Sequence, residues 1–275
     1  MSLVIQTNVA SLEAQRNLGK SQITLQNTFN KLSSGYRINS AKDDAAGLAI
    51  SESLKSQIRS LTVNERNAGD AISMAQTAEG ALGEISNIVL RMRELATQGA
   101  NGALQSSDRD FIQPEFTSLQ AEIRRIMTST KFNGKSLITS IAKSEAFQIG
   151  VSNVTADRIA VTFGGLALQS LTATARVNSG PGNSRSALDT IDTALFRVSQ
   201  ARARFGAMMN RFDTTISNIQ SVRLSLANAN SRIRDVDVAE DAAAQARAQV
   251  LIQAGTSVLA QANQAPQQAM SLLKG

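Results

Sequence analysis

Apolar residues recur at steps of three and four along most of this chain, which is the spacing of one face of an α-helix. The longest run predicts a helix over about 45–98 and comprises Ile50, Leu54, Ile58, Leu61, Glu65, Ala68, Ile72, Ala75, Glu79, Leu82, Ile85, Val89, Met92 and Ala96. At 1.5 Å per residue, this helix would extend for about 80 Å. A second run of comparable length predicts a helix over about 187–234. Together they favour a mainly α fold, a long antiparallel coiled-coil or helical-bundle rod.

Smaller elements are expected between the two long helices. A short apolar stripe predicts a third helix over about 107–129, joined to the first by a Gly-rich hairpin loop. Residues 132–176 lack the helical spacing of apolar residues and contain β-like runs at 146–151 and 158–163. They predict a small β-hairpin patch on the rod. Residues 178–184 are rich in Gly, Ser and Asn and predict a loop.

The two ends of the chain carry weaker stripes. The large apolar residues of the stripes are Val9, Leu12, Leu18, Leu25 and Leu32 near the start, and Leu251, Val258, Leu259, Leu272 and Leu273 near the end. Arg247 is the one charge between residues 242 and 273. Helices with so little apolar area are not stable alone. They need a partner surface, either each other or copies of themselves.

The composition argues against an enzyme. The chain contains no Cys, no His and no Trp, which excludes thiolate nucleophiles, disulfides and the commonest metal ligand and general base. The adjacent carboxylates Asp43 and Asp44 point in different directions on a helix and lack a convergent partner. We therefore expect no catalytic, cofactor-binding or metal-binding residues, and a function carried by surfaces.

The charge distribution narrows the choice of partners. Lys and Arg number 28 against 22 Asp and Glu, a net charge of +6. The excess is diffuse, with no basic run longer than the pair Arg124 and Arg125 and no interleaved aromatic residues, so nucleic-acid binding is not expected. No stretch approaches the roughly 18 consecutive apolar residues of a membrane span, and no N-terminal signal segment is recognisable. By these signs alone, the chain would be cytosolic.

Several motifs, in order, change that view. Residues 32–51 read LSSGYRINSAKDDAAGLAIS, followed by NERNAGDAIS at 64–73, LRMRELATQGANG at 90–102, FNGKSLI at 132–138, SRIRDVDVAED at 231–241 and QAGTSVLAQANQAPQQAMSLLKG at 253–275. This set closely resembles bacterial flagellin. The acid usual in the family is replaced here by Arg234, and only a short loop at 177–186 stands where many members carry outer domains.

The resemblance implies a structural subunit that polymerises into the flagellar filament for motility, secreted through type III export without a cleavable signal. It implies that residues 1–44 and 236–275 form a terminal coiled-coil domain, the inner tube, and that residues 45–235 form the rod, with no outer variable domain. The terminal apolar residues named above are then the polymerisation residues. The implied partners are the chain itself as a helical homopolymer, the flagellar cap and hook-associated proteins, and a flagellin export chaperone.

Two other interpretations stay open. A hook–filament junction protein shares the terminal motifs, and a non-flagellar coiled-coil scaffold would show the same periodicity. By family analogy, Arg91, Leu95 and Glu115 could also contact an animal Toll-like receptor. Contact with a neighbouring protofilament is the preferred primary role of Arg91 and Glu115.

Overall fold

The computed structural model describes the backbone of residues 7–173, 175–178 and 180–274, and side chains as far as residue 264. The chain separates into two compact units. One comprises the residues up to Ser56 together with those from Ser225 onward, and the other comprises Gln57–Leu224. Each unit is described by itself below.

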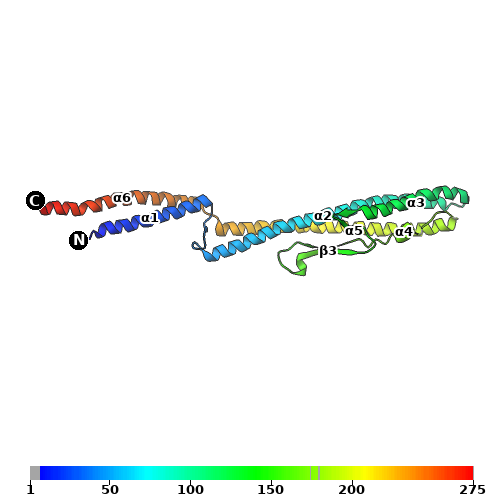
Figure 1. Ribbon diagram of the computed structural model, residues 1–275, viewed down its shortest axis with the longest axis horizontal. Helices are drawn as coiled ribbons and strands as arrows, with labels where there is room; N and C mark the ends of the chain where they lie inside the picture. Colours follow the sequence, from blue (N-terminus) through cyan, green and yellow to red (C-terminus); the bar gives the residue numbers. More distant parts are fainter. Residues whose placement is uncertain (1–6, 174, 179, 275) are drawn as a thin grey trace. The chain divides into compact units, whose positions relative to one another are not determined.

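Three helices build the unit at 57–224: α2 (Ala45–Gly99), α3 (Ser106–Ser129) and α5 (Pro181–Arg234). Their apolar stripes meet in one core, whose fully buried members include Leu82, Ile85, Val89 and Met92 of α2, Phe116 and Ile123 of α3, and Ile191, Val198 and Phe212 of α5. Figure 1 shows these helices running side by side. The fold class is confirmed: mainly α, with long packed helices.

Ion pairs join α2 and α5 along their antiparallel packing. Arg202 Nη2 lies 2.7 Å from Glu79 Oε1, and Arg93 Nε lies 2.8 Å from Asp192 Oδ1. Glu79 and Arg202 each interrupt an otherwise apolar stripe. Because the two interruptions face each other, the charges pair at the edge of the core instead of being buried alone.

Two antiparallel hairpins lie beside the helices. The first, β1 (Lys131–Phe132) and β2 (Lys135–Ser136), turns through Asn133 and Gly134, which both have positive φ. The second pairs β3 (Lys143–Gln148) with β4 (Arg158–Phe163), and the short helix α4 (Gln169–Ala173) follows it. Alternate residues of β4 are buried, and Phe163 stacks on Phe205 of α5 with ring centroids 5.5 Å apart. The hairpin is therefore held against α5 by its apolar face.

The other unit contains the antiparallel pair α1 (Val9–Ser34) and α6 (Val238–Lys274), visible side by side in Figure 1. Asn8 Nδ2 donates to the carbonyl of Ala262 over 2.8 Å, and near the opposite end of α1 Val236 N donates to the carbonyl of Gly35. The pairing expected of the N- and C-terminal segments is present.

Several expected boundaries differ from the structure. The expected loop at 178–184 is wrong from Pro181, where α5 begins, six residues before the expected 187. Proline suits the first turn because its φ is preset and it needs no amide donor there. The strand expected at 146–151 runs from Lys143 to Gln148. Along the sequence, the division between the two units falls within α2 and α5, at 56/57 and 224/225, and the domain boundaries expected at 44/45 and 235/236 stay predictions.

Candidate functional site

The seam between α1 and α6 is a heptad pattern with a thin apolar core. On α1 the buried and half-buried positions step by three and four through Ser11, Ala14, Leu18, Ser21, Leu25, Thr28 and Leu32. On α6 the matching positions are Gln245, Ala248, Ile252, Gly255, Leu259 and Ala262. More than half of these side chains are small or polar. The pair therefore buries much less apolar area than a coiled coil with large residues in every layer.

Small residues on one helix receive large ones from the other. A Cβ added at Gly255 would lie 3.3 Å from Leu18 Cδ1, so Leu18 packs directly against the α6 backbone. Polar contacts support the end of the seam, where Ser11 Oγ donates to Asn263 Oδ1 over 2.7 Å. Asn8 also caps α1, since its Oδ1 accepts from Ser11 N at 3.0 Å.

Apolar side chains outside the seam are exposed. On α1 these are Val9, Leu12, Ile23 and Phe29, and on α6 they are Val238, Val250, Leu251 and Val258, each more than half exposed. The unit thus leaves apolar side chains uncovered on both of its helices. We call this set the outer apolar residues.

The sequence-predicted polymerisation residues divide between the two environments. Leu18, Leu25, Leu32 and Leu259 are half-buried in the seam. Val9, Leu12, Leu251 and Val258 belong to the outer apolar residues. The side chains of Leu272 and Leu273 lie outside the described residues. Sequence reasoning missed Ile23 and Val250, although a helical wheel would have placed both away from the seam.

The junction between the helices brings together motifs from the two ends of the chain. Arg37 N donates to the carbonyl of Arg234 over 2.7 Å, and Arg37 Nη2 donates to the carbonyl of Ile233 over 2.7 Å. Gly35, at φ 74°, ends α1 and accepts from Val236 N. We call these contacts the junction clasp. Residues 32–51 and 231–241 thus build one structure.

Arg234 is the central side chain of the junction clasp. Its guanidinium lies 4.6 Å from the ring centroid of Tyr36, and its Nη1 lies 2.7 Å from Glu52 Oε1. The hydrogen bond from Arg234, together with the nearby Lys55, lowers the pKa of Glu52. The acid usual at this position in the family would repel Glu52, so the exchange to Arg changes this contact from repulsion to attraction.

The adjacent carboxylates Asp43 and Asp44 serve the turn between α1 and α2. Asp43 Oδ2 accepts from the amides of Asn39 and Ser40, and these hydrogen bonds lower the pKa of Asp43. Asp44 Oδ1 accepts from Gly47 N over 2.9 Å at the start of α2. Both carboxylates are occupied as local caps, the role of such residues at helix starts.

The residues expected at a receptor contact are only partly brought together. Arg91 lies 2.9 Å from Glu115 and 2.7 Å from Glu94, and the side chains of Arg91 and Glu115 are about half exposed. Leu95 is 3% exposed and belongs to the core. A surface contact at this point therefore has Arg91 and Glu115 available but not Leu95.

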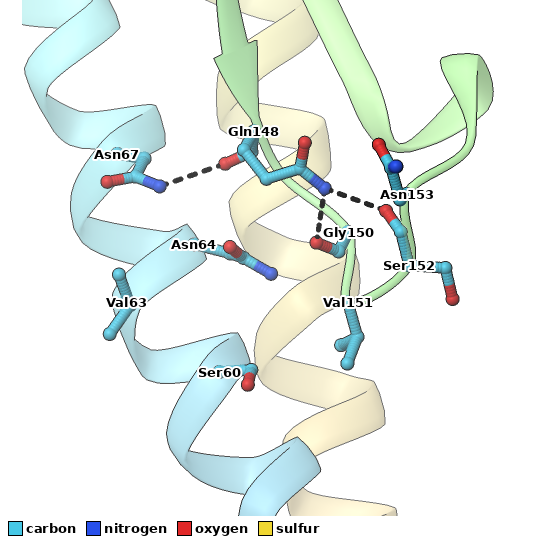
Figure 2. Close-up of a pocket in the computed structure, with 9 residues that line it drawn as sticks. All are labelled: Ser60, Val63, Asn64, Asn67, Gln148, Gly150, Val151, Ser152 and Asn153. Atoms are coloured by element: carbon cyan, nitrogen blue, oxygen red, sulfur yellow. Dashed lines mark hydrogen bonds between the residues drawn. The ribbon is translucent and has the colours of Figure 1, made fainter.

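A hollow of about 480 Å³, lined by uncharged polar side chains together with Val63 and Val151, separates α2 from the segment after β3. In Figure 2, Asn67 Nδ2 donates to the carbonyl of Gln148 over 3.0 Å, while Gln148 Nε2 donates to the carbonyls of Gly150 and Ser152. Asn64 is 5% exposed, and its Nδ2 has no partner among the described residues. No charged residue lines the hollow. Its amides attach the hairpin to α2.

Other kinds of site are not found in the described part of the chain. None of its helices combines the length and apolar character that crossing a bilayer requires. Its Asp and Glu residues form no group of three or more suited to holding a metal ion.

Comparisons with known proteins agree on one family. The bacterial flagellin N-terminal helical region matches residues 5–143, and the bacterial flagellin C-terminal helical region matches residues 188–273. The flagellin of Halalkalibacterium halodurans is 41% identical over 272 residues, covering 99% of this chain and 100% of that protein. The flagellar filament 33 kDa core protein of Treponema phagedenis is 38% identical over 286 residues, again covering 99% and 100%.

One solved structure is similar in fold alone. It is described as a flagellar hook-associated protein from Vibrio parahaemolyticus and is 14% identical, with a TM-score of 0.60 over 70% of this chain and 100% of that chain.

Proposed function

The chain belongs to the bacterial flagellin family, and from that premise we propose that it polymerises into the flagellar filament through its paired terminal helices. Full-length similarity to a flagellin and to a flagellar filament core protein supports a filament subunit over a hook–filament junction protein or a non-flagellar scaffold. The proposal assigns α1 and α6 to contacts between copies, and the helices of the other unit to the body of each subunit.

One observation carries this proposal: the α1–α6 pair has small or polar residues in its seam and apolar residues on its outside. Such a pair gains little from its own packing, whereas covering the outer apolar residues with further copies contributes roughly 25 cal/mol for each Å² buried. A contact between unlike surfaces of identical chains gives a ring when its rotation closes and an open helical fibre when it does not, but it does not give a symmetric dimer. The pattern therefore favours a polymer over a dimer.

The finer parts of the proposal follow the family. Residues 1–44 and 236–275 would line the inner tube of the filament, and residues 45–235 would form the surrounding rod, with no outer variable domain. The chain would leave the cell unfolded through type III export, accompanied by an export chaperone, and assemble beneath the flagellar cap beyond the hook-associated proteins. The absence of Cys from the sequence supports such a route, because refolding requires no redox step.

Deletion of residues 253–275 tests the proposal. We expect the truncated chain to form no filaments in seeded assembly observed by negative-stain microscopy, while the α2–α3–α5 unit keeps its helicity and its cooperative thermal transition. Replacing Leu251 and Val258 together by Asp should give the same defect without shortening the chain. Normal filaments from the truncated chain would contradict the assignment of α6 to polymerisation.

A second role for the exposed pair Arg91 and Glu115 is contact with an animal Toll-like receptor. Their shared surface and mutual ion pair support this, whereas the burial of Leu95 removes one of the residues carried over from the family. Purified monomer applied to receptor-expressing reporter cells tests this role. An equal response from wild type and Arg91→Ala would exclude Arg91 from the contact.

A further inference from the structure

Phe111 is the most exposed of the large apolar side chains in the described part of the chain, at 83%. Its position is rigid, because the neighbouring Arg109 and Ile112 are buried. Arg109 Nε donates to the carbonyl of Gly99 and Arg109 Nη2 to that of Asn101, each over 2.9 Å, which fixes the first turn of α3 to the end of α2. Phe111 is therefore a preformed apolar projection, held in place before any partner arrives.

Carboxylates surround this projection. Asp108 and Glu115 lie one helical turn from Phe111 on either side, and the exposed Asp110 lies about 100° around the helix from it. Asp108 Oδ2 accepts from Gln105 N, and Glu115 pairs with Arg91. Asp110 is in none of the ion pairs of the described residues. The projection is apolar at its tip and acidic around its base.

An apolar hollow with the opposite charge lies elsewhere on the same unit. It has a volume of about 310 Å³ between β4 and α5, and its apolar lining comes from Val161, Phe205, Ala207 and Met208. Arg204 and Arg211 also line it, and both are exposed. Neither arginine forms an ion pair within the described residues. Since an apolar cavity of about 150 Å³ holds a benzene ring, this hollow has room for one phenyl side chain.

We propose that Phe111 of one subunit inserts into the hollow at Val161, Phe205 and Met208 of a neighbouring subunit, with Asp110 facing Arg204 and Arg211. This inference rests on the proposed polymerisation and adds a second contact to that of the terminal helices. The inserted ring lies against Phe205, and Arg204 and Arg211, which also line the hollow, supply cations for the ring and for the carboxylates of α3. Because projection and hollow are different surfaces, the contact is head-to-tail and can repeat from subunit to subunit along an open helix.

A second exposed phenylalanine, Phe196, fits the hollow less well than Phe111 does. Phe196 on α5 is 68% exposed, but the next residue is Arg197. Inserting Phe196 would bring a further cation toward Arg204 and Arg211, whereas Phe111 brings carboxylates. Asp192, one turn before Phe196, already pairs with Arg93, so Phe196 is a control with the same ring and no unpaired carboxylate beside it.

The absence of native Cys allows a direct test by disulfide trapping. Chains carrying Phe111→Cys alone and Ala207→Cys alone are copolymerised on wild-type seeds, oxidised and separated on a non-reducing gel. A dimer band that appears only in the mixed filaments is the expected result, and neither variant can form an internal disulfide. The mixture of Phe196→Cys and Ala207→Cys should give no such band.

Each outcome has one meaning. Mixed filaments that form normally but show no Phe111–Ala207 band overturn the insertion and leave polymerisation through α1 and α6 intact. Wild-type chains that fail to elongate seeds overturn the proposed function itself. Charge reversal adds a second measurement: Asp110→Arg should raise the critical concentration about tenfold, and combining it with Arg211→Asp should restore most of the loss. No recovery in the double variant would exclude the charge pairing.

Discussion

Replacing Leu12 by Gln separates assembly from folding more sharply than truncation does. Leu12 is 56% exposed on the outside of the α1–α6 pair, so the change leaves the seam untouched. Full burial of a leucine is worth about 1.5–3 kcal/mol, and covering the exposed part of Leu12 is therefore worth about 0.8–1.7 kcal/mol. Since about 1.4 kcal/mol is a factor of ten, the critical concentration should rise about four- to fifteenfold.

The assay is sedimentation of seeded filaments over a range of subunit concentrations, with circular dichroism of the unassembled chain as the folding control. Gln is as good a helix former as Leu within a few tenths of a kcal/mol, so the monomer's thermal transition should not move. Leu12→Met keeps the apolar surface and should assemble like wild type. A Leu12→Gln critical concentration within twofold of wild type would refute the idea that this face is covered in the filament.

Three further changes test the core, the junction clasp and the hairpin. Phe212 is fully buried in α5. The substitution Phe212→Ala should lower the free energy of unfolding, measured by urea denaturation, by about 3–5 kcal/mol. Arg234→Ala should raise the pKa of Glu52 toward its ordinary 4.5, followed by NMR titration. Because the folded-state pKa of Glu52 is lowered, Glu52 stabilises the wild-type fold above about pH 4.5, and this stabilisation is lost as the pH falls further. The unfolding free energy of the variant should therefore depend less on pH in this range. Asn67→Ala removes the donor to Gln148 and should speed amide exchange in β3, whereas Asn64→Leu, which removes an unpaired donor, should not.

The long helices could be predicted because their stripes are periodic over many turns, and the pairing of charged interruptions such as Glu79 with Arg202 agrees with that register. The start of α5 could not. Gly180 and Pro181 suggest a loop, yet Ser184 is buried and its Oγ donates to the carbonyl of Val177 over 2.9 Å. This contact depends on the fold and has no signal in the local sequence.

The terminal pair shows the same limit. Its apolar residues were recognisable, but separating Leu18 in the seam from Leu12 on the outside requires the partner helix to be known. The junction clasp was less predictable still, because both of its motifs stand out while nothing in either indicates that they meet. Exposure of Phe111 likewise became visible only once Arg109 and Ile112 were placed in the core.

The junction clasp joins residues near the start of the chain to residues near its end, so it cannot form in a chain that is cut short. Arg37 and Ile233 are 196 positions apart, and closing so long a flexible loop costs about 5 kcal/mol in chain entropy. Ser51 Oγ, 2.8 Å from Asn230 Oδ1, shows that α2 and α5 already bring these segments close, so the clasp can form after the long helices at a much smaller cost. A chain cut short before residue 233 has no acceptor for Arg37 and no α6 beside α1. The contacts at the end of α1 therefore form only in a chain that extends past residue 233.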